Sequence, residues 1–233
     1  MPAFAATPSE GWCRNGDFTA TNPNFGLAVV NRKVRAHVLK DENGCPNAKR
    51  RCRASYHLNP GERVVTGRSA GNYVCAYFPR ADGGGSAGWL DWSSLRSLRV
   101  DAAPAASSWF GRWSDGGNPT LRITGQRGVL GITGEAFWPG PDPTEDWPAP
   151  RSGTIGGNLI RRDNQAQYKV DECRIDLTLL GDLLVAGDNG RCGGTNVSFN
   201  GVYRRQSRSV SFPPSSRLSQ TLQKGNQASG LDH

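Results

Sequence analysis

Apolar and polar residues alternate most regularly between Cys173 and Arg205. A period of two predicts β-strands, because successive side chains of a strand point to opposite faces of a sheet. Within this stretch, Gly181-Asp182 stands between two apolar runs, and glycine in the first of two positions is typical of a type II′ hairpin turn. A third run, from Val197 to Tyr203, is expected to pair with the hairpin or to close a sheet.

Short strand-like runs separated by glycine-rich turns fill most of the remaining chain, and long segments with a helical period are absent. Glycine (30 residues) and proline (15 residues) are frequent, which favours turns over helices. The sequence therefore predicts an all-β protein. No apolar run approaches the ~20 residues that a membrane-spanning helix needs, so we expect no membrane span.

The first half of the chain resembles the bacterial SH3-like domain. The residues that carry the resemblance are Val34-Arg35, Leu58–Val65, Tyr73–Phe78 and Gly88-Trp89-Leu90 before Leu95. The resemblance implies a small barrel with a peptide-binding groove. One wall of that groove differs here, because a basic, cysteine-containing loop replaces the usual Gly-Pro-Ser. We expect the first strand at Lys33–Arg35, followed by a long polar loop to Asn59.

Composition and strand spacing divide the chain into five parts. Residues 1–27 are interpreted as a signal-peptide remnant and an irregular arm, and residues 28–100 as the SH3-like domain. Residues 101–108 have the small residues and proline of a linker. About eight short antiparallel strands in residues 109–206 predict a closed barrel or a sandwich, which generally resembles lipocalin-like and lysozyme-inhibitor barrels. Residues 207–233 are polar and are expected to be disordered.

Six cysteines, an even number, indicate three disulfide bonds and an oxidising compartment, because cytosolic proteins rarely hold disulfides. Around the predicted hairpin turn, the numbers of facing residues sum to about 363. Cys173 then faces position 190, and a small bulge at residues 188–190 would bring it to Cys192. We therefore expect a Cys173–Cys192 disulfide.

The four remaining cysteines allow three connectivities. We favour Cys45–Cys52, which would hold the polar loop, together with Cys13–Cys75, which would attach the N-terminal arm to a central strand. The alternative joins Cys52 to Cys75 and Cys13 to Cys45. A zinc site is disfavoured, because the Cys45–Cys52 spacing is too wide for a typical zinc motif.

The N-terminus points to an exported protein, and the charge points to an anionic partner. Ala3-Phe4-Ala5 fits the A-x-A pattern before a signal-peptide cleavage site, so we expect a periplasmic or secreted protein. The net charge of +8 is concentrated in residues 1–106, which hold 14 Lys and Arg against 8 Asp and Glu. In an oxidising compartment, a basic surface favours an anionic wall polymer, lipid headgroups or an acidic protein over nucleic acid.

The sequence holds no recognisable catalytic motif: no nucleophile elbow, no metalloprotease helix and no phosphate-binding loop. A carboxylate pair of the glycosidase type remains as an alternative, with Glu135, Asp142, Glu145 and Asp146 clustered around Trp138 and Trp147. An acidic, proline-rich surface loop explains this cluster more simply. We therefore expect no enzyme activity, no catalytic residue, no bound metal and no cofactor.

Two groups of residues are candidates for binding. Lys49, Arg50, Arg51 and Arg53 place four cations within five positions, which suits contact with carboxylates or phosphates as well as a solvated loop. Tyr56 and Trp92 are the aromatic residues that best suit an exposed groove, whereas Trp89 is expected in the core.

These features favour a non-catalytic envelope protein that recognises peptidoglycan or a protein acting on it. One alternative is an inhibitor or immunity protein that blocks a cell-wall hydrolase, because preorganised loops lose little entropy on docking. The other is a carboxylate-dependent cell-wall glycosidase that uses Glu135 with one of the loop acids.

Overall fold

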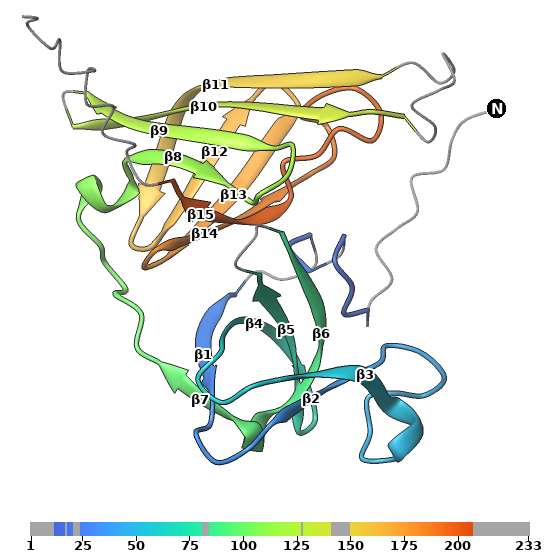
Figure 1. Cartoon of the computed structure of the whole chain (residues 1–233). Coiled ribbons are helices and arrows are strands. Elements are labelled where there is room, and N and C mark those ends of the chain that lie inside the picture. The colour runs from blue at the N-terminus through green and yellow to red at the C-terminus, as the bar shows by residue number, and fades with distance from the viewer. Residues whose placement is uncertain are drawn as a thin grey trace, which may run out of the picture.

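The computed structural model describes residues 12–16, 18–20, 24–80, 84–126, 128–140 and 150–206. These residues form fifteen strands and three short 3-10 helices, with no α-helix among them. Figure 1 shows two bodies: a seven-stranded sheet below and a closed eight-stranded barrel above. The expectation of an all-β fold that ends in an eight-stranded antiparallel barrel is confirmed.

The sheet is antiparallel throughout and has the order β3-β2-β6-β5-β4-β1-β7, so β3 and β7 are its edge strands. Its strands are β1 (Gly26–Val30), β2 (Ala36–Leu39), β3 (Arg53–Leu58), β4 (Arg63–Ala70), β5 (Tyr73–Pro79), β6 (Gly85–Asp91) and β7 (Leu95–Leu98). The short helices η1 (Arg50–Cys52) and η2 (Trp92–Ser94) precede β3 and β7. One face of the sheet encloses an apolar cluster that includes Val38, Val74 and Leu90.

The barrel closes in the order β10-β11-β12-β13-β14-β15-β8-β9. Its elements are η3 (Ala106–Trp109), β8 (Gly111–Ser114), β9 (Thr120–Gln126), β10 (Val129–Trp138), β11 (Arg151–Arg162), β12 (Gln165–Val170), β13 (Cys173–Leu180), β14 (Leu183–Asp188) and β15 (Gly201–Arg205). Inward-facing side chains such as Trp109, Trp113 and Tyr203 fill the interior. Filling by side chains is characteristic of small barrels and distinguishes this one from barrels that enclose a cargo.

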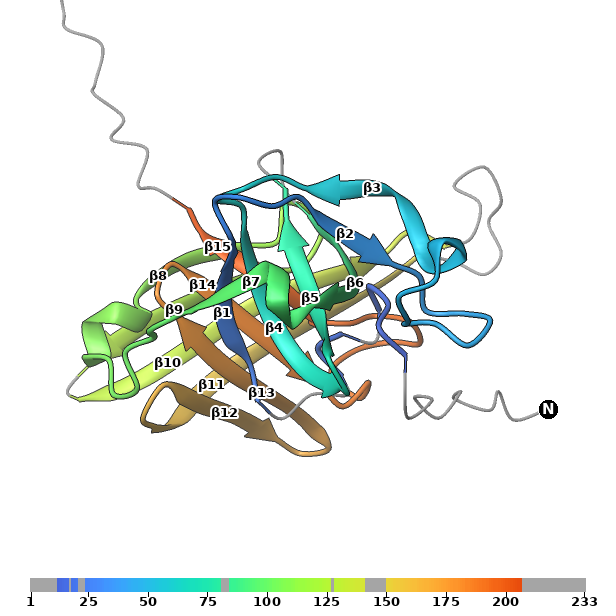
Figure 2. The same cartoon turned by 90° about the horizontal axis from the view of Figure 1, so that it is seen from below.

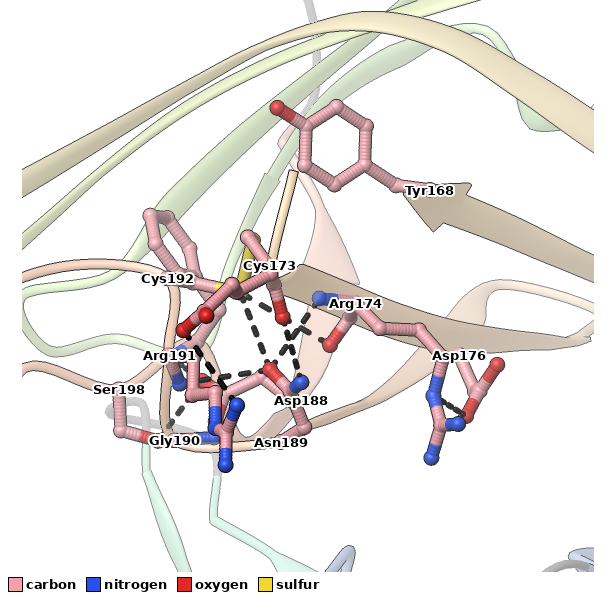
Figure 3. The surroundings of a disulfide bond; sticks show 12 residues. Tyr168, Cys173, Arg174, Asp176, Asp188, Asn189, Gly190, Arg191, Cys192 and Ser198 are labelled. Atoms are coloured by element: carbon pink, nitrogen blue, oxygen red, sulfur yellow. Dashed lines mark hydrogen bonds and ion pairs between the residues drawn. A yellow bond between two sulfur atoms is a disulfide. The ribbon is translucent and has the colours of Figure 1, made fainter. Parts of the chain in front are cut away.

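The hairpin of β13 and β14 has the predicted register. Ile175 pairs with Asp188 and Leu180 with Leu183, and Gly181 has a φ of 72°, the positive φ that the first position of a type II′ turn requires. Past the end of the ladder, the Asn189 side chain accepts a hydrogen bond from the Arg174 N–H at 3.1 Å, which shapes the connection to Cys192. Figure 3 shows the resulting Cys173–Cys192 disulfide.

The two other favoured disulfides, Cys45–Cys52 and Cys13–Cys75, are also confirmed. Cys13–Cys75 attaches the N-terminal arm to the central strand β5, as expected. The arm is held further by Asp41, whose side chain accepts hydrogen bonds from the Cys13 N–H at 2.7 Å and from the Trp89 indole N–H at 2.8 Å. Trp89 is buried in the core, as the sequence indicates.

The sheet and the barrel share a third apolar cluster. Val65, Cys75 and Tyr77 from the outer face of the sheet belong to it together with Leu183 and Val202 from the outer face of the barrel. Figures 1 and 2 show β14 and β15 on the barrel wall that the sheet covers. Residues 183–186 of β14 and Val202 and Tyr203 of β15 are therefore buried on both strand faces, one in the barrel interior and one against the sheet.

Two expectations for the first half are wrong. The strand expected at Lys33–Arg35 begins instead at Ala36, because residues 32 and 33 form a turn closed by a hydrogen bond from the Val34 N–H to the Asn31 carbonyl. The expected polar loop to Asn59 contains the strand β3. As an edge strand, β3 exposes most of its side chains, so its sequence lacks the apolar alternation of a half-buried strand.

Candidate ligand-binding site

The basic residues predicted to bind a ligand lie on a loop that a disulfide closes. Cys45 and Cys52 are only seven positions apart, and the loop they close ends in η1. Within it, the Asn47 side chain donates to the Gly44 carbonyl at 2.8 Å and accepts from the Lys49 N–H at 2.8 Å. These local bonds make the loop a rigid support. In Figure 1 it projects from the β2–β3 edge of the sheet, at the lower right.

Lys49, Arg50 and Arg51 from this loop, and Arg53 from the first position of β3, are all exposed. In the part of the chain that the structure describes, none of the four forms an ion pair with an acidic side chain. Four like charges this close repel one another, and an anionic ligand would relieve that repulsion. We name Lys49, Arg50, Arg51 and Arg53 the basic loop.

Tyr56 lies farther along β3 and is a partly exposed aromatic, with 43% of its surface accessible. Its ring lies 5.8 Å from that of Phe78, and partial burial raises the pKa of its phenol. Two hollows meet at this side chain. One, of about 630 Å³, reaches toward Arg14 and Asp41; the other, of about 760 Å³, reaches toward the barrel.

Trp92 does not join this group. It begins η2, at the end of β6, and its indole N–H donates to the Ser69 hydroxyl at 3.1 Å. Its ring packs partly against the apolar cluster inside the sheet, and Trp92 lines neither hollow at Tyr56. The structure thus places Tyr56 on β3, the strand that follows the basic loop, and Trp92 at the end of β6.

The larger hollow at Tyr56 is a cleft between the sheet and the barrel, which the sequence analysis did not predict. Its lining residues come from β3 to β6 on one side and from the β13–β14 turn and β15 on the other: Tyr56, His57, Leu58, Gly61, Glu62, Arg63, Phe78, Pro79, Arg80, Ser86, Asp182, Leu183 and Arg204. A signal for this junction exists in the sequence. The run Leu183-Leu184-Val185-Ala186 is apolar on both strand faces, which indicates that another element covers the outside of the barrel.

Two polar contacts cross the junction beside the cleft. The Arg63 guanidinium bonds both carboxylate oxygens of Asp182, at 2.6 and 3.2 Å, and this hydrogen bonding holds the pKa of Asp182 below its usual value. Arg204 of the barrel donates to the Pro79 carbonyl of the sheet at 3.1 Å. Nearby, burial raises the pKa of Tyr77 to about 12, with Asp115 adding to the rise.

The residues of the glycosidase alternative are only partly within the described chain. Asp142, Glu145, Asp146 and Trp147 lie outside it. Glu135 is exposed on the outer face of β10, in a shallow hollow of about 290 Å³ that Arg112 and Arg122 also line. Trp138, at the end of the same strand, packs partly against the barrel core.

Asp188, the acidic residue at the end of β14, has a structural role. Its carboxylate accepts hydrogen bonds from the Gly190 N–H at 2.7 Å, from the Ser198 hydroxyl at 3.1 Å and from the Phe199 N–H. These bonds organise the loop that carries Cys192, as Figure 3 shows. Among the described residues, no group of three or more His, Cys, Asp or Glu side chains is arranged to hold a metal ion.

In comparisons of the chain with protein-family models, curated proteins and solved structures, nothing matches. Within the described ranges, no helix has the length and apolar character to cross a membrane.

Proposed function

We propose that the protein is a non-catalytic, exported binding protein of the bacterial envelope that recognises peptidoglycan through the basic loop and Tyr56. The observation that carries the proposal is the display of four exposed cations, unpaired within the described chain, on a disulfide-closed loop that leads into the strand of Tyr56. The resemblance of the first half's sequence to the bacterial SH3-like domain supports this proposal, as do the three disulfides, which are typical of proteins in oxidising compartments.

The chemistry of the surface matches that of the polymer. Peptidoglycan carries carboxylates on its peptides, and arginine binds carboxylates with paired, charge-assisted hydrogen bonds. Tyr56 presents both an apolar ring face, suited to a sugar ring, and a hydroxyl group that can form hydrogen bonds. Because the loop is closed by a disulfide before any ligand arrives, binding costs little conformational entropy.

The test is retention of the purified, oxidised protein on insoluble peptidoglycan. We expect binding that weakens as salt is raised, because exposed charges are screened. The double variant Arg50→Gln/Arg51→Gln should bind about tenfold more weakly, the loss expected for one or two charged hydrogen bonds. The matched control is Arg96→Gln/Arg99→Gln, which removes the same charge from exposed positions at the opposite edge of the sheet.

A second pair of variants tests the aromatic contact. Tyr56→Ala should reduce retention, whereas Phe137→Ala, which truncates an aromatic of similar exposure on the barrel (45% against 43%), should not. If the wild-type protein is not retained, or if both charge variants weaken binding equally, the proposal is wrong.

A further inference from the structure

We propose that the cleft between the sheet and the barrel is a second ligand site, which binds a carboxylate attached to an apolar or aromatic group. The site is distinct from the basic loop, since Lys49, Arg50, Arg51 and Arg53 do not line the cleft. The cleft shares Tyr56 with the proposed peptidoglycan surface, but its carboxylate contact at Arg204 does not depend on peptidoglycan binding.

The cleft is fixed in shape. Along one side, the apolar cluster that includes Tyr77 and Leu183 holds the sheet against the barrel. Beside it, the Arg63–Asp182 pair and the bond from Arg204 to Pro79 link the two bodies. The volume of about 760 Å³ lies within the range of sites for small organic ligands, and such sites commonly form where two domains meet.

The cleft has an apolar wall. Phe78, Leu58 and Leu183, which are almost fully buried, line it. Tyr56 adds an aromatic ring that is partly exposed and stands at the border of the cleft. An apolar or aromatic group bound here would remove this surface from water, which is the main favourable term in burying such groups.

The opposite part of the cleft is lined by charged side chains. Arg63, Arg80 and Arg204 line it, together with the carboxylates Glu62 and Asp182. Arg63 is matched by Asp182, and Glu62 accepts hydrogen bonds from Asn59. Arg204 lies close enough to Asp182 to help lower its pKa, and its Nη2 donates one hydrogen bond to the Pro79 carbonyl. A guanidinium has five N–H donors, so Arg204 retains donors for a ligand. An anion is the complementary group.

Together, these features define the ligand as an amphipathic acid: an apolar part against Phe78 and Tyr56, and a carboxylate at Arg204. Two sources of this chemistry exist, a free small acid and the C-terminal end of a peptide. They differ by the amide group next to the carboxylate, which only the peptide end supplies.

The experiment maps amide chemical shifts of the full-length, isotope-labelled protein during titration with N-acetyl-L-phenylalanine, its neutral amide and 3-phenylpropionate. We expect saturable shifts at His57, Ser86 and Leu183 with the acids, and at least about fivefold weaker binding of the neutral amide, as loss of a charged hydrogen bond predicts. Comparable binding of both acids identifies a small acid as the ligand class, and tighter binding of N-acetyl-L-phenylalanine identifies a chain end.

Two variants test the assignment of the carboxylate. Arg204→Gln should weaken binding of the acids to the level of the neutral amide, while Arg122→Gln, which removes an exposed arginine from β9, should leave binding unchanged. Ser86→Leu, which adds bulk inside the cleft, should weaken all three probes. Absence of saturable shifts at the cleft, or equal binding of the acid and its amide, would overturn the inference whether or not peptidoglycan binds.

Discussion

At the scale of single residues, Asp115 opposes folding at neutral pH. It follows β8 at the junction, and its carboxylate accepts a hydrogen bond from the Gly117 N–H at 2.7 Å. Burial raises the pKa of Asp115, an effect that hydrogen bonds from backbone N–H groups only partly offset. The folded protein therefore favours the protonated form, which means that ionisation of Asp115 costs stability.

This cost predicts a pH-dependent gain from Asp115→Asn. Asparagine keeps the Oδ1 acceptor for Gly117 and removes the charge, so the variant should melt at a higher temperature at pH 7. Because the folded-state pKa is raised, the penalty is absent below the unfolded-state value near 3.8 and fully present above the folded-state value. The gain should therefore shrink as the pH falls through this range.

Thermal unfolding from pH 7 to pH 3 measures this effect. Asp101→Asn is the matched control, because Asp101 accepts a similar hydrogen bond, from the Ala103 N–H at 3.0 Å, at an exposed position. It should change the melting temperature little at any pH. A destabilised Asp115→Asn protein at pH 7 would contradict the explanation.

At the scale of elements, sequence reasoning succeeded where one strand face is buried and the other is exposed. Short strand-like runs predicted the earlier strands of the barrel, and the alternation after Cys173 together with Gly181 predicted the turn that sets the register of Cys173 with Cys192. It failed for β3, whose exposed residues leave no periodic signal, and it therefore described the strand of Tyr56 as a loop.

The candidate site was predictable only in part, because a sequence pattern reports local features and not contacts between distant segments. Local sequence identifies the basic loop, because Lys49, Arg50 and Arg51 are adjacent and the nearby cysteines pair with each other. The cleft joins β3 to β15 across about 150 positions of the chain, and no local pattern reports such a contact. Only the doubly apolar character of β14 indicates that something packs there.

Two of the disulfides are expected to differ in how much they contribute to the free energy of unfolding and in whether they support ligand binding. The Cys45–Cys52 bond closes a loop of seven positions and the Cys13–Cys75 bond one of 62. The loop-entropy relation then predicts that removing the first costs about 2 kcal/mol of unfolding free energy and removing the second about 4 kcal/mol. We expect Cys45→Ala/Cys52→Ala to weaken peptidoglycan binding, because the basic loop loses its support.

Chemical denaturation measures the loss of unfolding free energy in each double variant. The peptidoglycan assay then shows whether binding changes as well. Cys13→Ala/Cys75→Ala, assayed under conditions where it is folded, should retain the affinity of the wild type despite its greater loss of stability. Unchanged binding by the Cys45→Ala/Cys52→Ala protein would show that the disulfide does not support the binding surface.

At the scale of the whole molecule, the shared apolar cluster makes the sheet and the barrel dependent on each other. Separating them would expose buried residues of both bodies, including Val65, Leu183 and Val202. Fully burying one such side chain contributes about 1.5–3 kcal/mol. Several of them together are comparable to the entire stability of a typical domain, so we expect one cooperative unfolding transition.

Ile132→Val tests whether the sheet and the barrel unfold together. Ile132 is buried in the apolar cluster inside the barrel, to which no residue of the sheet belongs. Loss of one methylene in a packed core should cost about 1 kcal/mol. If the bodies unfold together, native-state hydrogen exchange should show this loss equally for the most protected amides of β13 in the barrel and of β5 in the sheet.

Val74→Ala, inside the sheet, is the reciprocal variant and should lower protection in β13 as much as in β5. Loss confined to the mutated body would mean that the sheet and the barrel unfold independently, and that the junction holding the cleft opens more readily than either core.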